Sequence, residues 1–161
     1  MAAKAPEEKT NVMRLLDLQG VPYKKHLYTD IPSTNGREIA EILGQDPDSV
    51  FKTLVTQGKS GNYYVFVIPV TEELNLKKAA KAVSEKAIAM IPQKQLLPLT
   101  GYVHGGCSPI GMKKPFPTIL HETAVLFDTI CFSGGKIGYQ VETAPDNLIL
   151  LAGAEYADVC G

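Results

Sequence analysis

The sequence contains no tryptophan and only three cysteines, Cys107, Cys131 and Cys160. Their number is odd and no C-x-x-C pair occurs, so we expect neither a disulfide framework nor a thiolate zinc knuckle. The first residues hold no apolar segment of the kind that a secretory signal requires. The longest apolar runs, such as 63–70, are too short to cross a bilayer. These absences predict a reduced, cytoplasmic protein with no membrane partner.

An excess of charge of one sign is also missing. The 161 residues carry 16 basic and 17 acidic side chains, a formal net charge of −1. Proteins that coat long stretches of duplex need many phosphate contacts, so DNA is not an expected partner. A local basic patch could still hold a small part of a nucleic acid. The length and the 45% of apolar residues are typical of one folded domain.

Helical and alternating apolar patterns are interleaved along the chain. The pattern predicts an α+β fold, a single domain built on a mixed, curved sheet flanked by helices. We expect residues 1–9 to fray, residues 10–153 to form the domain and residues 154–161 to form a tail. Helices are predicted after Thr10, after Ser33 and Thr34 (with Ile39, Ile42 and Leu43 inward), after Asn75 and from Pro145. Strands are predicted at 21–28, 51–57, 63–70, 87–90, 118–121, 129–132 and 139–143.

Two glycine-rich turns and one lysine indicate where chemistry could occur. The turns at 105–109 and 133–136 can present backbone N–H groups to an anion or an oxyanion. The alternative, that their glycines only permit tight turns, stays open. Lys52 interrupts an apolar strand, so its ammonium must reach either solvent at a sheet edge or a polar cavity. In a cavity it would serve as a point charge for a phosphate or carbonyl oxygen.

A protein nucleophile is a weaker hypothesis. Cys107 follows His104 by three residues and adjoins Ser108, which allows a thiol or serine hydrolase acting on small esters. No G-x-S-x-G elbow is present, however, and His26 and His121 have no diagnostic spacing. A small buried thiol is the simpler interpretation of Cys107. Zinc ligation by histidine and cysteine lacks paired spacings, so we expect no metal ion and no cofactor.

Five short motifs, taken in order, resemble one known family. The chain is similar to the YbaK family, relatives of the editing insertion domain of bacterial prolyl-tRNA synthetase, from about Thr10 to about Gly153. Each motif alone is weak, whereas the ordered set is specific. The motifs are 50–54 (VFKTL), 100–102 (TGY), 105–111 (GGCSPIG), 113–118 (KKPFPT) and 133–138 (SGGKIG).

This resemblance implies a barrel-like sheet and trans-editing of mischarged tRNA. The substrate it implies is Cys-tRNA(Pro), with Ala-tRNA(Pro) as the alternative. The partners it implies are the CCA end of the mischarged tRNA and, as a candidate, prolyl-tRNA synthetase. A non-catalytic domain that binds a tRNA end or a nucleotide is a further alternative. The resemblance implies a catalytic group of Lys52, Gly105, Gly106 and Ser108. It implies substrate-binding residues Tyr28, Phe51, Thr53, Pro109, Ser133, Gly134, Gly135 and Gln140, and tRNA contacts at Lys113, Lys114 and Lys136.

In this family the thiol of the substrate cysteine is thought to attack its own ester carbonyl. That mechanism would explain why the sequence shows no catalytic triad, since covalency places the thiol beside the carbonyl. Two positions depart from the family pattern. Cys107 replaces an aliphatic residue, and Gln140 stands where many relatives carry aspartate. We therefore do not assign Cys107 as a nucleophile, and an amide would have to take over the role of that aspartate.

Overall fold

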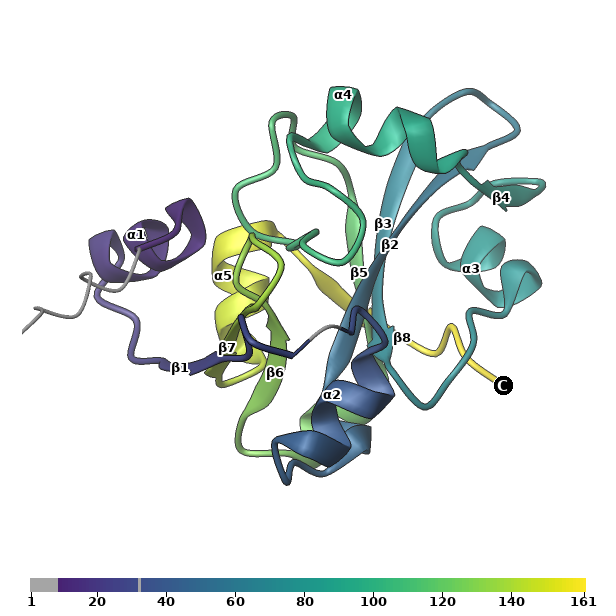
Figure 1. Ribbon diagram of the computed structural model, residues 1–161. Helices are drawn as coiled ribbons and strands as arrows, with labels where there is room; N and C mark the ends of the chain where they lie inside the picture. Colours follow the sequence, from purple (N-terminus) through teal and green to yellow (C-terminus); the bar gives the residue numbers. More distant parts are fainter. Residues whose placement is uncertain (1–8, 32) are drawn as a thin grey trace, which may run out of the picture.

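Two β-sheets form the centre of the molecule in the computed structural model, which describes residues 9–31 and 33–161 (Figure 1). A three-stranded antiparallel sheet has the order β1-β7-β6, and a five-stranded mixed sheet has the order β4-β2-β3-β5-β8. A parallel bridge between Val50 and Cys131 joins the two. The α+β class and the mixed sheet are confirmed. The strands are β1 (Lys24–Leu27), β2 (Phe51–Gly58), β3 (Tyr63–Pro69), β4 (Ile88–Met90), β5 (Thr118–His121), β6 (Ile130–Ser133), β7 (Tyr139–Thr143) and β8 (Glu155–Ala157).

Short helices cover the sheets, and α1, α5 and α3 are clearly separated in Figure 1, with α3 on the side away from α5. None of the helices in the described part of the chain is long and apolar enough to cross a membrane. The α-helices are α1 (Asn11–Leu18), α2 (Gly36–Ile42), α3 (Leu76–Ala82), α4 (Leu96–Thr100) and α5 (Asp146–Ala152). The 3₁₀ turns are η1 (Pro47–Ser49), η2 (Gln93–Gln95) and η3 (Glu122–Leu126).

Local sequence signals explain where most elements begin. The Thr10 side chain accepts a hydrogen bond from the Met13 N–H and caps α1 as predicted, and Gly20, at φ +67°, follows its end. Helix α2 differs from the prediction. Its cap is Asn35, whose side chain accepts from the Glu38 N–H, while the Ser33 hydroxyl accepts from the Asn35 N–H one turn earlier.

The inward face of α2 also differs from the expected one. Ile39 is buried as predicted, but Ile42 is 54% exposed, because it lies roughly a third of a helical turn away from the face that Ile39 and Ala40 define. The buried side of α2 therefore consists of Ile39 and Ala40. Ala40 packs with Val50 and Cys131 where the two sheets meet.

The C-terminal residues belong to the sheet. We set residues 154–161 apart as a tail, but β8 pairs in parallel with β5, and Cys160 forms an antiparallel bridge with Leu74. The three residues of β8 are too few to show a strand pattern in the sequence, and their partner strand β5 lies far away along the chain. Of the expected frayed N-terminus, residues 1–8 lie outside the described part; Lys9 forms an ion pair with Asp17 of α1.

The main core lies between the two sheets. It is built from the inner faces of β2, β3, β6 and β7 together with α1 and α5, and includes Leu16, Val65, Phe132 and Leu148. A second core, which includes Phe66, Ile68 and Ala79, lies on the other face of β3 under α3. Because side chains alternate along a strand, β2 and β3 contribute to both cores.

Candidate functional site

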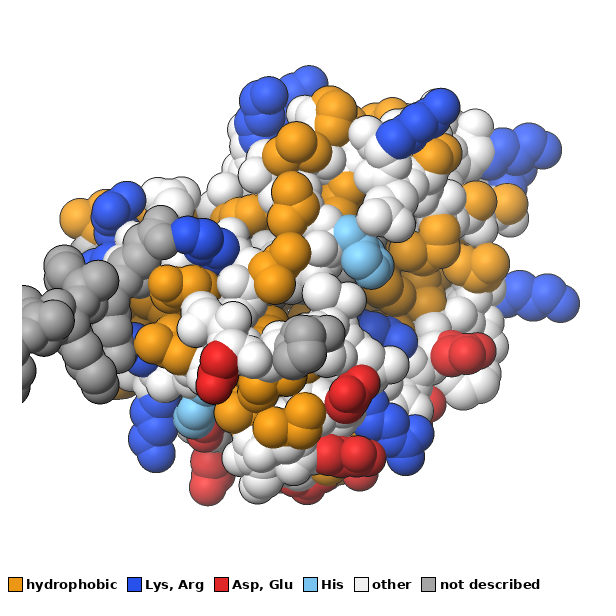
Figure 2. Space-filling view, viewed as in Figure 1, with side chains coloured by type: hydrophobic (Ala, Val, Ile, Leu, Met, Phe, Trp, Pro, Cys, Tyr) orange, Lys and Arg blue, Asp and Glu red, His pale blue; other side chains and the backbone are white. Residues whose placement is uncertain are grey.

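A cavity of about 340 Å³ lies between α2, α4 and the two glycine turns. The face shown in Figure 2 is hollowed between the elements labelled α4 and α2 in Figure 1, and hydrophobic side chains line much of the hollow. Lys52, Gly105 and Ser133, one residue from each of the three segments that the sequence singled out, line this single cavity. Four more predicted substrate-binding residues line it too: Tyr28, Phe51, Thr53 and Gln140.

Lys52 brings a positive charge to the cavity wall. Its side chain is half-buried, and within the described residues no hydrogen bond or ion pair holds its ammonium group. A partly desolvated cation with no internal partner gains most from an incoming anion. Of the two places that the sequence left open for Lys52, solvent at a sheet edge or a polar cavity, the structure favours the cavity.

The free edge of β2 faces the same cavity. The Val50 carbonyl accepts from the Val70 N–H, and the Gly58 N–H donates to the Asn62 carbonyl, at the two ends of β3. The even-numbered residues of β2 therefore point their N–H and C=O groups toward β3. The odd-numbered residues point the other way, where β4 pairs only as far as the bond from Ile91 N–H to Val55 C=O. The backbone groups of Thr53 are therefore left to the cavity, whereas Phe51 adjoins the bridge between Val50 and Cys131 of β6.

Thr53 adds a side-chain group to that edge. Its Oγ1 is buried and has no hydrogen-bond partner among the described residues. A buried hydroxyl without a partner costs free energy, typically about 1–3 kcal/mol, unless water or a ligand satisfies it. Thr53 is thus suited to hydrogen-bond a polar ligand.

The first glycine turn contributes Gly105 and Cys107 to the cavity lining and uses its other residues for structure. Gly105 lines the cavity at φ +87°. The Gly106 N–H, which we expected to face an oxyanion, donates instead to the Val103 carbonyl. A Cβ on Gly106 would come within 2.9 Å of the Ile137 nitrogen, so the glycine lets the two turns pack backbone to backbone.

Ser108 and Pro109 lie outside the cavity lining. Ser108 is fully buried, and its hydroxyl accepts a hydrogen bond from the Ile110 N–H. Pro109 is buried beside it. Both residues shape the turn, and the catalytic role of Ser108 and the substrate-binding role of Pro109 stay predictions.

The second glycine turn is similar. Ser133 lines the cavity, but its hydroxyl accepts from the Gly135 N–H, and the Gly134 N–H donates to the Tyr139 carbonyl. Gly134 and Gly135 therefore have no N–H left for substrate, and neither lines the cavity. The substrate-binding roles of these two glycines stay predictions. A Cβ on Gly135 would meet Val12 of α1 at 2.8 Å.

The three lysines predicted to contact tRNA lie outside the cavity lining. Lys113 and Lys114 are exposed on the segment that follows the first turn. Lys136 is exposed on the second turn, with its Nζ 5.6 Å from the centre of the Tyr139 ring. Their place around the turns is compatible with a contact to a longer ligand.

Gln140 sits in a pair of amides that the sequence did not reveal. Gln45 Nε2 donates to Gln140 Oε1 at 2.6 Å, and Gln140 Nε2 donates in return to Gln45 Oε1 at 3.4 Å. The two residues are 95 positions apart, so no spacing could have joined them. The pair makes one wall of the cavity polar but uncharged.

Cys107 and His104 line the cavity without forming a catalytic pair. Burial raises the pKa of the Cys107 thiol to about 12, so the thiol stays protonated near neutral pH. His104 is exposed at the rim, and no bond links it to Cys107 or Ser108. This geometry disfavours a serine or cysteine hydrolase.

The apolar walls were largely missed from the sequence because they come from many elements. Ile39 was predicted only to face inward and Val70 only to end a strand, and Met90 and Leu96 had no assignment to a site. Apolar residues that line a cavity have the same periodicity as those that fill a core, so no signal separates them.

Within the described residues, the one group of side chains that could hold a metal ion is His26, Cys131 and Glu142, and it lies outside the cavity lining.

Comparison with known proteins identifies the family. The sequence model of the aminoacyl-tRNA editing domain matches residues 33–151, which include most of the cavity lining. The chain belongs to the aminoacyl-tRNA editing domain family. The resemblance that we inferred from the five motifs is thereby confirmed.

Individual members of this family agree with the assignment. EbsC of Enterococcus faecalis, named as a proposed Cys-tRNA(Pro)/Cys-tRNA(Cys) deacylase, is 43% identical over 160 residues, which cover 99% of this chain and 98% of EbsC. A proline–tRNA ligase of Kosmotoga olearia is 24% identical over 139 residues, 84% of this chain but 24% of the ligase. The crystal structure of a proposed trans-editing enzyme for prolyl tRNA synthetase has the same fold, with a TM-score of 0.79, 24% identity and coverage of 94% and 98%.

Proposed function

We propose that this protein is a trans-acting aminoacyl-tRNA deacylase that releases cysteine from Cys-tRNA(Pro). Its membership of the editing-domain family and its 43% identity to EbsC over nearly the full length of both chains support this activity. The observation that carries the proposal is the position of Lys52, which lines one cavity together with Gly105 and Ser133. Translation in the cytoplasm is the setting in which such a substrate occurs.

The nucleophile in this proposal comes from the substrate. Cys107 is held as a thiol, and Ser108 is buried away from the cavity, so neither is suited to attack an ester. The thiol of the bound cysteine has an ordinary pKa near ~8.5, and a few per cent is ionised at neutral pH. Covalent attachment holds this thiolate next to its own ester carbonyl, which replaces a bimolecular encounter by an intramolecular step.

The reaction then proceeds in two steps. The thiolate sulfur bonds to the carbonyl carbon, the ester C–O bond breaks and the ribose oxygen takes up a proton, which leaves a cyclic thioester of cysteine. Water later hydrolyses this thioester to free cysteine. The protein needs to orient the ester and to stabilise the negative charge that develops on the carbonyl oxygen.

The cavity offers groups for both tasks. Lys52 supplies a positive charge for the developing oxyanion or for a phosphate of the terminal adenosine. The backbone N–H group of Thr53 lies on the free edge of β2, and the unpartnered Oγ1 of the same residue lies beside it. This edge takes the role that we expected the N–H groups of Gly106, Gly134 and Gly135 to play.

The remaining parts of the tRNA bind outside the cavity. Lys113, Lys114 and Lys136 are placed to contact the CCA end, and so few contacts predict weak, salt-dependent binding. Prolyl-tRNA synthetase is the partner that we propose to supply further affinity, in line with the similarity to a proline–tRNA ligase.

Relative deacylation rates on three charged tRNAs test this function. With purified protein we expect the fastest release from Cys-tRNA(Pro), because only that substrate carries a thiol, and slower release from Ala-tRNA(Pro) and Pro-tRNA(Pro). Size alone would discriminate by only about 1–3 kcal/mol per methylene. Fastest release from Ala-tRNA(Pro) would make the protein an alanine deacylase, and binding without release from any of the three would make it a non-catalytic tRNA-end domain.

A further inference from the structure

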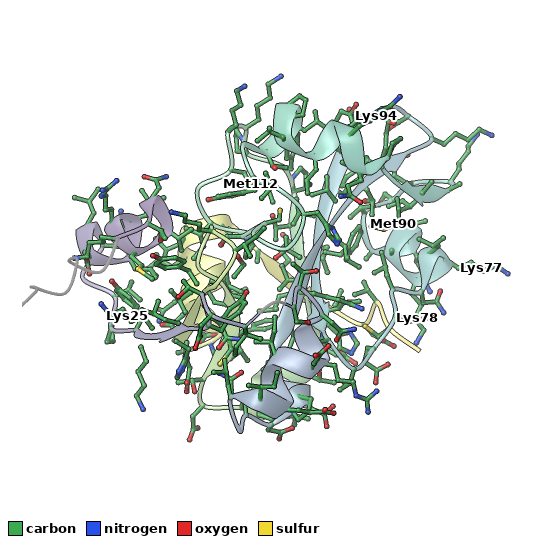
Figure 3. All side chains as sticks on the ribbon, in the orientation of Figure 1. Lys25, Lys77, Lys78, Met90, Lys94 and Met112 are labelled. Atoms are coloured by element: carbon green, nitrogen blue, oxygen red, sulfur yellow. The ribbon has the colours of Figure 1, made fainter. Side chains whose placement is uncertain are left out.

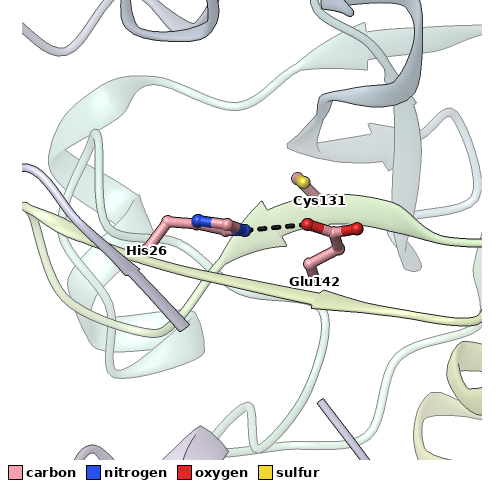
Figure 4. Close-up of side chains that lie close together, drawn as sticks. All are labelled: His26, Cys131 and Glu142. Carbon is pink, nitrogen blue, oxygen red and sulfur yellow. Dashed lines mark hydrogen bonds and ion pairs between the residues drawn. The ribbon is translucent and has the colours of Figure 1, made fainter. Parts of the chain in front are cut away.

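Three side chains from three strands converge at one place on the smaller sheet (Figure 4). His26 lies on β1, Cys131 on β6 and Glu142 on β7, and their ligating atoms all lie within 4.8 Å of one another. The central strand β7 pairs with both neighbours, with Glu142 opposite Cys131 and Gln140 opposite His26. Because these positions share one face of the sheet, pairing of the strands alone brings the three side chains together.

We propose that His26, Cys131 and Glu142 bind a divalent transition-metal ion of the zinc class. Imidazole nitrogen, thiolate sulfur and carboxylate oxygen are the three ligand types that zinc uses in proteins. The thiolate favours zinc over magnesium or calcium, which prefer oxygen ligands. Three protein ligands leave the fourth tetrahedral position to solvent. The three ligands lie outside the lining of the deacylation cavity, which they adjoin through Gln45 and Gln140, and the site does not depend on the proposed function.

The distances allow such an ion after a small adjustment. His26 Nε2 and Glu142 Oε1 are 2.8 Å apart as a hydrogen-bonded pair. Ligand atoms at 2.0–2.3 Å from a tetrahedral zinc are roughly 3.3–3.7 Å apart, so the two side chains must separate by about half an ångström. They have room to do so, since their side chains are 30% and 23% exposed. Cys131, at 4% exposure, is the fixed ligand.

Neighbouring groups already orient two of the ligands. Thr129 Oγ1 donates to Glu142 Oε2 at 2.5 Å, which leaves the other carboxylate oxygen toward His26. Gln45 Nε2 donates toward Cys131 Sγ at 3.8 Å, an arrangement that stabilises a thiolate. Such outer partners are usual around metal ligands and tune their affinity.

The cysteine and the carboxylate supply two anionic ligands to a bound ion. A cation of the zinc class displaces the proton of the Cys131 thiol and is then held by a thiolate and a carboxylate. Without an ion, Glu142 Oε1 pairs with the His26 imidazole and Glu142 Oε2 accepts from the Thr129 hydroxyl.

Metal titration of the purified, reduced and chelator-treated protein tests the site. We expect one zinc ion per chain by calorimetry, and cobalt should produce the thiolate charge-transfer and tetrahedral d–d absorption of a sulfur-ligated ion. Cys131→Ser and His26→Gln should each weaken binding by at least about 100-fold, the upper end of what loss of an outer-shell partner costs. The matched variants Cys160→Ser and His104→Gln should bind as the unchanged protein does.

Two results would overturn the proposal. One is the lack of stoichiometric zinc binding by the unchanged protein, which would leave His26 and Glu142 as an ion pair only. The other is binding that persists in both Cys131→Ser and His26→Gln. If Cys131→Ser does not fold, Glu142→Gln takes its place, because Glu142 is partly exposed and its amide keeps a similar shape.

Discussion

Replacing Lys52 by alanine is expected to lower the release of cysteine from Cys-tRNA(Pro) by about 100- to 1,000-fold. The substitution removes the positive charge that lines the cavity beside Gly105 and Ser133. Loss of a single preorganised group that stabilises an oxyanion costs rates of this order. Single-turnover deacylation with radiolabelled cysteine on tRNA(Pro) measures the effect.

A second lysine provides the control for this prediction. Lys77 on α3 is exposed and points away from the molecule in Figure 3, so Lys77→Ala changes the net charge equally and leaves the cavity intact. We expect Lys77→Ala to retain the full rate and both variants to melt near the temperature of the unchanged protein. A Lys52→Ala protein that is folded and fully active would remove Lys52 from the mechanism.

Methylation of the substrate sulfur is expected to reduce release by at least about 1,000-fold. S-methylcysteinyl-tRNA(Pro) keeps the ester and most of the side chain but cannot form a thiolate. Well-oriented intramolecular groups act at effective molarities of about 10⁵–10⁸ M, so removing the nucleophile should cost most of the rate. The same single-turnover assay compares the two substrates.

Two controls separate loss of the nucleophile from loss of binding. The methylated substrate should inhibit release from Cys-tRNA(Pro), which shows that it enters the cavity. Cys107→Ala should retain the rate within about twofold, because the Cys107 thiol, with a pKa raised to about 12, is not an effective nucleophile at neutral pH. Equal release from methylated and free cysteine, or an inactive Cys107→Ala protein, would point to attack by a group of the protein.

Local signals predicted the parts of the fold that local physics determines. The Thr10 cap and the neighbouring strands predicted at 51–57 and 63–70 appear where the sequence places them, because a cap or a short hairpin depends on a few adjacent residues. The cap of α2 differs by one residue from the nearer of the two predicted caps, since Asn35 competes with Ser33 and Thr34 for the same role. β8 was missed because a three-residue edge strand has almost no pattern of its own.

The site could be predicted only at the level of segments. Lys52, Gly105 and Ser133 were predicted from motif and resemblance, and the structure brings them to one cavity. Which backbone donors remain free could not be predicted, because this depends on the bonds that the Gly106 and Gly134 N–H groups make within their turns. The free edge of β2 follows from how far β4 extends, a tertiary property.

Contacts between residues that are far apart in the sequence could not be predicted for the same reason. The Gln45–Gln140 pair and the group of His26, Cys131 and Glu142 join residues that are up to 116 positions apart. Spacing rules detect metal ligands on one helix or one loop, whereas strands pair by a register that the sequence does not state. The zinc site was therefore not expected from the histidine and cysteine spacings.

The identity of the first product tests most directly whether the protein supplies the charge and the substrate supplies the nucleophile. A single-turnover reaction on Cys-tRNA(Pro), quenched in acid at early times, is analysed by mass spectrometry for both small molecules and intact protein. We expect a cyclic thioester of cysteine, one water lighter than cysteine, to appear before free cysteine, with the protein unmodified. Free cysteine without a preceding ring, or a cysteinyl adduct on Cys107 or another residue, would contradict this mechanism.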